Sequence, residues 1–250
     1  MSLEVFRSQV EGVVGPDSVI TASDLLERYS KDMSFVTPRK PFFAVKVHSA
    51  DQVQAIIKLA NAAKVPLIPF SCGWNGQGAH IPLVSGVVVD LSEMKNAEID
   101  EICRNAIIEP GVTFRELAEL AKQYGLRPLY PVTLPADASA LVTNLERCPL
   151  YSWYRYGSNL NLLTFEIVLP TGELIGTGQW AIFNRVHRQS ASPDTMCYGV
   201  SRMFLGAQGT LGIAVKGAIV LKNIHEENRV VFLAFDKLER VIEAFRCIAK

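Results

Sequence analysis

The 250-residue sequence lacks the features that would assign it to several classes of protein. Lysine plus arginine and aspartate plus glutamate both number 25, so the formal net charge is zero. Broad nucleic-acid binding needs a basic surface and is therefore not indicated. No apolar run approaches the roughly 20 residues that span a bilayer. The start, MSLEVFRSQVEG, lacks the basic-then-apolar layout of a signal peptide, so we expect a cytoplasmic protein without a membrane span.

Cysteine is also sparse, and its spacing excludes two further classes. The five cysteines are Cys72, Cys103, Cys148, Cys197 and Cys247. They are dispersed, odd in number and without a CxxC pair, so neither a disulfide framework nor a zinc site is indicated, and we expect no metal. Most of them are expected to be small buried hydrophobic residues. Cys72 differs from the others because it lies in a glycine-rich loop.

The first half of the chain has the pattern of a compact α/β unit. The runs PFFAVKV (41–47), VPLIPF (65–70) and GVVVDLS (86–92) are typical of buried strands. Between the first two runs, Ser49 and Gln52 give a capping-box signature, and an apolar pattern of helical period follows. A strand, a helix, a strand, a loop and a strand within about 50 residues predict a mostly buried sheet.

The rest of the chain mixes helices, hairpins and turns. The expected elements are a lead segment helical around Ala22 to Tyr29, a strand at 105–112, a helix from Thr113 to Gly125, a Pro-rich connection at 127–144 and a hairpin at 162–178. An exposed loop around 180–195 is expected next, then a short helix, a glycine turn and a strand pair at 201–224, a strand at 229–235 and a helix at 236–250. A lone strand and helix cannot close a core, so another polypeptide, a longer form of this chain, or docking onto the main domain must complete them.

The loop PFSCGWNGQGAH (69–80) lies between two of the predicted strands and contains no lysine or arginine. Its glycines could simply permit a tight connection, since glycine tolerates positive φ. Alternatively, small side chains let successive backbone N–H groups form a concavity for a phosphate. The loop matches neither GxGxxG nor GxxxxGK[ST], the two common nucleotide-binding patterns. The residues alone leave both interpretations open.

Five motifs in register resemble those of one flavoprotein family. They are P-F-S-x-G-x-N-x-x-G (69–78), VVVDLSEM (87–94), IIEPGVTFREL (107–117), EIVLPTGELIGTG (166–178) and GAQGTLGI (206–213). Together they resemble the FAD-binding domain of the vanillyl-alcohol oxidase / p-cresol methylhydroxylase (PCMH-type) family over roughly residues 41–223. The first loop and the fourth motif are more similar to the para-alkylphenol branch than to the glycolate or D-lactate branch.

The resemblance implies an α+β fold of two α+β subdomains with FAD extended between them. It divides the chain into a lead segment (1–35), the FAD-binding domain (36–222) and the first strand and helix of an incomplete cap domain (223–250). Such a cap holds substrate and most catalytic side chains in this family. A second polypeptide is therefore expected to supply the rest of it.

The resemblance also implies which residues contact FAD. The loop from Ser71 to Gln77 would wrap the diphosphate through backbone amides, and three later segments would lie along the cofactor. The full set comprises Pro69, Ser71, Cys72, Gly73, Trp74, Asn75, Gly76 and Gln77; Pro110, Gly111 and Val112; Thr133, Leu134, Pro135, Ser139, Val142 and Thr143; and Gly209, Gly212 and Ile213.

Two departures from the family pattern bear on function. Many relatives carry a glycine pair after the Pro-rich connection, where this chain has SALVTNLERC (139–148). The first motif (69–78) also contains no histidine that could tether the flavin. His80 lies two residues beyond Gly78, and both His48 and His80 are expected to be structural. The aromatic cluster YSWYRYG (151–157) and His187 are predicted to lie in rim loops, and no catalytic residue is assigned.

The resemblance implies an FAD-dependent oxidoreductase, or the FAD-binding subunit of one. Its substrate would be an alcohol, a hydroxy acid or a para-alkylphenol-type compound that gives up a hydride to FAD. One alternative is an electron-relay subunit whose partner performs the substrate chemistry. Another is a scaffold that has lost FAD, which the altered 139–148 segment favours and the intact first loop opposes.

Overall fold

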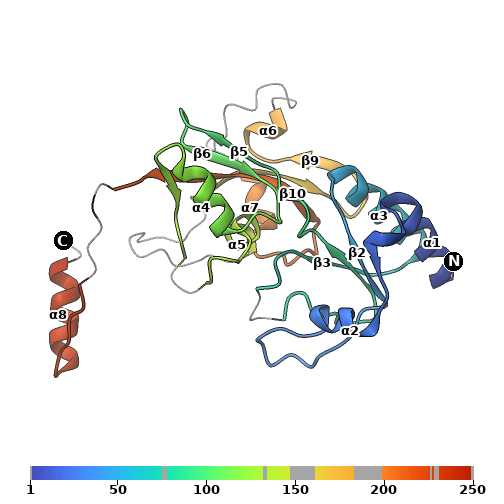
Figure 1. Ribbon diagram of the computed structural model, residues 1–250, viewed down its shortest axis with the longest axis horizontal. Helices are drawn as coiled ribbons and strands as arrows, with labels where there is room; N and C mark the ends of the chain where they lie inside the picture. Colours follow the sequence, from blue (N-terminus) through green and yellow to red (C-terminus); the bar gives the residue numbers. More distant parts are fainter. Residues whose placement is uncertain are drawn as a thin grey trace.

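The computed structural model describes residues 2–74, 78–131, 134–146, 161–182, 199–225, 227 and 231–248. Two sheets with their helices form the main body, and a helical arm stands apart from it (Figure 1). The two sheets contribute to three clusters of buried apolar side chains. This is the α+β architecture of two subdomains that the sequence predicts.

The first sheet has the strand order β1-β2-β4-β3, in which β2, β4 and β3 run parallel. Its strands are β1 (Val19–Ile20), β2 (Phe43–Lys46), β3 (Leu67–Phe70) and β4 (Val87–Asp90). Its helical segments are α1 (Leu3–Val14), η1 (Pro16–Ser18), α2 (Ser23–Leu26), η2 (Glu27–Tyr29) and α3 (Ala50–Ala63). Helices α1 and α3 pack beside each other against β2 and β4 and close the first core.

The start of α3 confirms the predicted cap at Ser49, except that the Gln52 side chain bonds to the residue before the cap. Ser49 Oγ accepts a hydrogen bond from the Gln52 backbone N–H at 3.3 Å. Gln52 Oε1 accepts from the His48 N–H at 2.8 Å, one residue before the cap. The helix ends at Lys64, which takes the left-handed conformation (φ 56°) just before the turn at Pro66. The local signals thus fix both ends of the helix.

The second sheet has the order β5-β6-β10-β8-β9, and β7 also pairs with β10. Its strands are β5 (Ala97–Asp100), β6 (Asn105–Ile108), β7 (Leu126–Pro128), β8 (Leu162–Val168), β9 (Leu174–Gly176) and β10 (Ile213–Asn223). Its helices are α4 (Phe114–Lys122), α5 (Ala140–Glu146), α6 (Gln179–Ile182) and α7 (Ser201–Phe204). The Thr113 side chain and Glu116 form a full capping box at the start of α4.

Strand β10 belongs to both cores. Ile213 and Val215 pack in the first core, whereas Ile219 and Leu221 pack in the second. All four would share one face of a regular strand, since side chains alternate. The pairing with β8 shifts register twice between Ala214 and Ile219, and such irregularities bend and twist a strand. One continuous strand therefore supplies side chains to two cores.

Several predicted elements are wrong in detail. Residues 213–223 form one strand rather than a pair, and residues 231–235 form no strand. The Pro-rich connection contains helix α5, and the first residues of the predicted loop around 180–195 belong to α6. Helix α1 and strand β5 lie where no element was expected.

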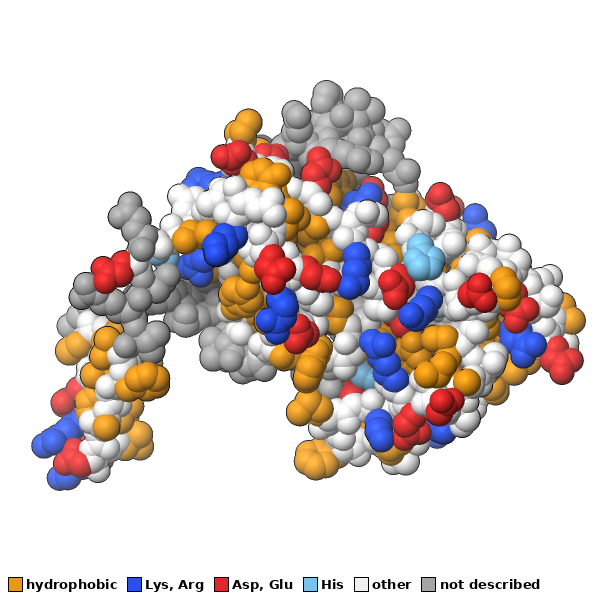
Figure 2. Space-filling view, viewed as in Figure 1, with side chains coloured by type: hydrophobic (Ala, Val, Ile, Leu, Met, Phe, Trp, Pro, Cys, Tyr) orange, Lys and Arg blue, Asp and Glu red, His pale blue; other side chains and the backbone are white. Residues whose placement is uncertain are grey.

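Residues 231–248, termed here the C-terminal arm, consist of an extended stretch and helix α8 (Leu238–Ile248). No residue of α8 is buried, so the arm does not dock onto the main domain. Phe232 is 93% exposed and Phe245 is 69% exposed. Hydrophobic side chains are visible along the arm in Figure 2. Within the described residues, no helix is both long and apolar enough to cross a bilayer.

A buried hydrogen bond joins the lead segment to the first sheet. The Tyr29 hydroxyl donates to Asp90 Oδ2 at 2.7 Å, and Asp90 is 0% exposed. Burial, and then the nearby Asp90 charge, raise the pKa of Tyr29 well above its usual value. The phenol therefore stays protonated and donates to the carboxylate.

We expect Tyr29→Phe to lower the free energy of unfolding by about 1–3 kcal/mol, because the buried Asp90 carboxylate loses a donor. Tyr124→Phe is the matched control, since Tyr124 is 42% exposed. Urea denaturation followed by circular dichroism measures both variants. Equal stability of the two variants would contradict this role of the hydrogen bond.

Candidate functional site

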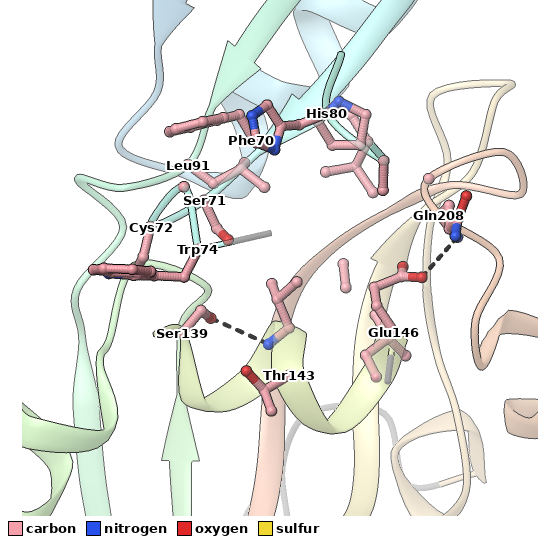
Figure 3. A pocket seen from close by; sticks show the side chains of 18 of the residues that line it. Phe70, Ser71, Cys72, Trp74, His80, Leu91, Ser139, Thr143, Glu146 and Gln208 are labelled. Carbon is pink, nitrogen blue, oxygen red and sulfur yellow. Dashed lines mark hydrogen bonds between the residues drawn. The ribbon is translucent and has the colours of Figure 1, made fainter. Parts of the chain in front are cut away.

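A cleft of about 890 Å³, counting its open mouth, lies between the two subdomains. It opens at the carboxyl ends of the parallel strands β3 and β4, where open α/β sheets usually bind ligands. Helix α5 and the turn before β10 form the facing side (Figure 3). Its lining consists of Pro69, Phe70, Ser71, Cys72, Gly73, Trp74, Ala79, His80, Leu91, Ser139, Val142, Thr143, Leu145, Glu146, Gln208, Gly209, Gly212, Ile213 and Ala214.

The glycine-rich loop provides unused hydrogen-bond donors. Within the described part of the chain, the backbone N–H groups of Ser71, Cys72 and Gly73 find no acceptor. Gly73 has φ +80°, and a Cβ there would lie 2.8 Å from Phe70 Cζ. A side chain is therefore excluded at Gly73. Backbone N–H groups that find no acceptor within the chain are left to bond to water or to a ligand.

The lead segment holds the far end of this loop. Asp32 accepts hydrogen bonds from the Gly78 N–H at 2.7 Å and the Ser34 N–H at 2.8 Å. Burial works against ionisation of Asp32, but these hydrogen bonds outweigh it and hold the pKa below its usual value. A Cβ on Gly78 would overlap the Val36 side chain. The loop is thus fixed by residues that precede it by about forty positions.

His80 packs inside the cleft wall rather than at an exposed loop edge. It is 5% exposed, its ring lies edge-on to Phe70 at 5.1 Å between centroids, and its Nε2 lies 3.3 Å from the Lys31 carbonyl oxygen. Figure 3 shows the two rings together at one side of the cleft. The structural role expected for this histidine therefore coincides with a place on the cleft surface.

Cys72 contributes a neutral thiol to the lining. Burial, and then the Glu116 charge, raise its pKa to about 12. Its Sγ lies 3.6 Å from the Gly111 carbonyl oxygen. Because the thiolate is the reactive form of cysteine, this thiol is a poor nucleophile at neutral pH. Cys103 and Cys247 are exposed, contrary to the expectation that most cysteines are buried.

Helix α5 forms part of the side of the cleft that faces the glycine-rich loop. Ser139 Oγ accepts a hydrogen bond from the Val142 N–H at 3.1 Å, which caps the helix, and donates to the Pro110 carbonyl at 2.6 Å. The cap places Val142 and Thr143 on the cleft surface. The prolines that precede the helix obscured this cap in the sequence.

The turn before β10 completes the far side. Gly209 has φ +76°, and a Cβ there would overlap the Pro69 ring, so the two sides of the cleft touch at this glycine. Gln208 also has positive φ (50°), and its N–H donates to Glu146 Oε2 at 2.7 Å. Burial raises the pKa of Glu146, and the hydrogen bonds from Gln208 and Gly209 oppose this shift.

A family model described as an FAD binding domain matches residues 41–178, more than half of the chain. The chain belongs to this family. The crystal structure of p-cresol methylhydroxylase with substrate bound superposes with a TM-score of 0.75 at 25% identity, over 88% of this chain and 43% of that one. A 4-ethylphenol oxidase from Gulosibacter chungangensis shares the fold, with a TM-score of 0.77 at 22% identity over 91% of this chain and 44% of that one. The PCMH-type family expected from the motifs is confirmed, with FAD as its cofactor.

Relatives in sequence include proteins named for hydroxy-acid substrates and a protein named for a para-alkylphenol. A probable mitochondrial D-lactate dehydrogenase of Danio rerio is 28% identical over 97% of this chain and 48% of its own length. The D-2-hydroxyglutarate dehydrogenase of Stutzerimonas stutzeri is 30% identical over 95% and 50%. The 4-cresol dehydrogenase flavoprotein subunit of Pseudomonas putida is 31% identical over 68% and 34%. The chain spans about half the length of the first two relatives.

The cleft of this FAD-binding domain fits a dinucleotide diphosphate. Within its described lining there is no lysine or arginine, so backbone N–H groups must supply the attraction for phosphate. The unused donors of Ser71, Cys72 and Gly73 meet that need. Among the residues that the structure describes, no cluster of His, Cys, Asp and Glu could hold a metal ion.

The structure places the predicted contact residues in three groups. On the cleft surface lie Pro69, Ser71, Cys72, Gly73, Trp74, Ser139, Val142, Thr143, Gly209, Gly212 and Ile213. Away from the lining lie Pro110, Gly111, Val112, Leu134 and Pro135. Outside the described residues lie Asn75, Gly76, Gln77 and Thr133, as do the 151–157 cluster and His187.

Gly111 illustrates the second group. A Cβ there would lie 2.7 Å from the Met94 carbonyl oxygen and would overlap that of Ser92. The Gly111 N–H donates to Met94 O at 2.8 Å. Its conformation thus serves a close contact between two segments of backbone, and the predicted role in FAD contact stays a prediction.

Several residues that line the cleft were not predicted as cofactor contacts. They are Phe70, Ala79, His80, Leu91, Leu145, Glu146, Gln208 and Ala214. Most flank predicted motifs, and a wider reading of those motifs would have included them. Glu146 lies within the 139–148 segment, where this chain departs from the family's glycine pair, and that departure was the available signal.

We expect Gly209→Ala to weaken FAD binding several-fold, because the added methyl pushes the turn away from Pro69. Gly125→Ala is the matched control: Gly125 also has positive φ (67°), but a Cβ there would meet nothing within 4 Å. Each variant carries a backbone strain of about 1 kcal/mol, so only Gly209→Ala adds the collision. Titration of FAD by its fluorescence, with urea unfolding alongside, separates the effects. Equal FAD affinity in both variants would show that the contact is irrelevant to binding.

Proposed function

We propose that this chain is the FAD-holding subunit, or half, of a flavin-dependent oxidoreductase that oxidises an alcohol, a hydroxy acid or a para-alkylphenol-type compound. The observation that carries this proposal is the cleft between the two subdomains, with the unused N–H groups of Ser71, Cys72 and Gly73 on one side. The names of the relatives support both hydroxy-acid and para-alkylphenol substrates.

Within this proposal, the residues of the chain bind and orient the cofactor. The 71–77 loop would hold the diphosphate, and Ser139, Val142 and Thr143 on α5 would lie along the bound molecule with Gly209, Gly212 and Ile213. FAD supplies the redox chemistry by accepting a hydride or its equivalent from a substrate carbon. The neutral thiol of Cys72 packs at the site without acting as a nucleophile.

An electron-relay subunit is the second candidate function. The described lining offers few groups for proton transfer from a substrate. The thiol of Cys72 is protonated, His80 is buried beside Phe70, and Glu146 is engaged by the turn before β10. The lack of a suitable group in the described lining favours substrate chemistry on groups outside the described residues. In the relay case those groups belong to a partner chain.

The test is FAD uptake followed by anaerobic substrate addition. We expect the purified chain to retain FAD after gel filtration and to show visible flavin absorption. Bleaching by a 2-hydroxy acid, a primary alcohol or a 4-alkylphenol then assigns the substrate class. A chain that binds FAD, is bleached by none of them alone and is bleached only when its partner subunit is present acts as a relay. A chain that takes up no FAD contradicts the proposal, and the remaining interpretation is then a scaffold that has lost FAD.

A second polypeptide is proposed to cover the C-terminal arm. Helix α8 places apolar side chains at 238, 241, 242, 245 and 248, which gives one continuous stripe at helical spacing. Val231, Phe232 and Leu233, on the extended stretch of the arm, are also exposed, at 74%, 93% and 58%. A contiguous exposed surface of this kind is typical of an interaction site.

The cytoplasmic location stays a prediction, and the Danio rerio relative is named as mitochondrial.

We expect Phe245→Asp to abolish association with the second subunit, because it places a charge within the apolar stripe. Ile102→Asp is the control, since Ile102 is also an exposed apolar residue (93%, against 69% for Phe245) and lies on the β5–β6 turn. Native mass spectrometry of the complex formed from the two purified subunits measures association. Loss of association in both variants, or in neither, would exclude the arm as the interface.

A further inference from the structure

Glu146 occupies an unusual place for an acidic side chain. It ends helix α5 and lines the cleft across from Cys72 and Trp74 (Figure 3). Within the described lining it is the only aspartate or glutamate. A carboxylate at the end of a helix faces the negative end of the helix dipole, and here it also faces a site for an anionic cofactor. Such a position requires hydrogen-bond donors that hold the charge.

The turn before β10 supplies those donors. Gln208 and Gly209 both have positive φ, at 50° and 76°, and their N–H groups are directed at the Glu146 carboxylate. Successive N–H groups in such a turn form an anion-binding concavity. The Gly206 N–H also donates to the Leu145 carbonyl at 3.0 Å and ties the turn to the same end of α5. The chain's own carboxylate thus fills this concavity, which is closed to a phosphate.

The filled concavity constrains how a dinucleotide can lie in the cleft. The diphosphate of the dinucleotide is repelled by Glu146. It is attracted by the unused N–H groups of Ser71, Cys72 and Gly73 on the opposite side of the cleft. The parts of FAD next to the diphosphate are its two sugars, the ribityl chain and the ribose, which carry hydroxyl groups. An ionised carboxylate accepts about four hydrogen bonds, and two donors are accounted for in the described chain.

We propose that Glu146 accepts hydrogen bonds from sugar hydroxyls of FAD, on either the ribityl chain or the ribose. The inference rests on the proposed binding of FAD in this cleft. Acidic side chains recognise ribose hydroxyls in the same manner in doubly wound dinucleotide-binding folds. Here the carboxylate comes from the segment where many family members carry a glycine pair. Glu146 therefore selects a sugar-bearing flavin and sets its direction in the cleft.

The test combines a substitution with a change in the ligand. FAD affinity is measured by flavin fluorescence for the unmodified chain, for Glu146→Gln and Glu146→Asp, and for the control Glu98→Gln, at the exposed position of strand β5. Each protein is also titrated with FAD analogues that lack hydroxyls on the ribityl chain or on the ribose. Urea unfolding of each variant reports whether the fold is retained.

We expect Glu146→Gln and Glu146→Asp each to weaken FAD binding about tenfold, because one loses the charge and the other the reach. Glu98→Gln should leave it unchanged. Removing the hydroxyls that Glu146 contacts should weaken binding to the unmodified chain but not further weaken binding to Glu146→Gln. The analogue that shows this coupling identifies the sugar.

Three outcomes would overturn the inference. They are unchanged FAD affinity in Glu146→Gln, tighter binding through relief of repulsion, and losses that multiply for both analogues without coupling. The last outcome would assign Glu146 only to holding the turn in place. Failure of the unmodified chain to bind FAD would instead contradict the proposed function, so the two failures are distinguishable.

Discussion

The architecture depends on strand β10, which is buried in two cores at once. Its first residues, including Ile213 and Val215, pack with α1 and α3, and its later residues pack with α4 and α5. The register shifts against β8 let one strand serve both cores. The cleft lies where β10 begins, so the two subdomains cannot separate there without unpacking a strand. The candidate cofactor cleft is therefore built on a strand that both subdomains share.

Local signals were sufficient for much of the fold. Ser49 and Gln52 fixed the start of α3, and the parallel strands followed from their apolar runs. Helix α5 was missed because prolines precede its Ser139 cap, which becomes evident only when the Oγ bonds to Val142 and Pro110 are seen. The strand predicted at 229–235 is absent from its described residues, 231–235, for a different reason. A strand needs a hydrogen-bonding partner, and apolar composition alone does not provide one.

The sequence predicted which segments form the site, but not which of their residues come into contact. The glycine-rich loop and the 206–213 turn were identified from motifs, and most of their described residues line the cleft. The bond from Gly78 to Asp32 and the contact of Gly209 with Pro69 join residues distant in sequence, so no local pattern reveals them. Gly111 shows the converse, because its motif match coincides with a backbone contact outside the lining.

The chain order of the cleft residues has a consequence for biosynthesis. Phe70 and His80 emerge from the ribosome early, whereas Gly209 and the start of β10 follow more than 120 residues later. A nascent chain therefore carries only one side of the cleft while these intervening residues are synthesised. A cofactor that contacts both sides of the cleft can therefore be held only after the start of β10 has been synthesised.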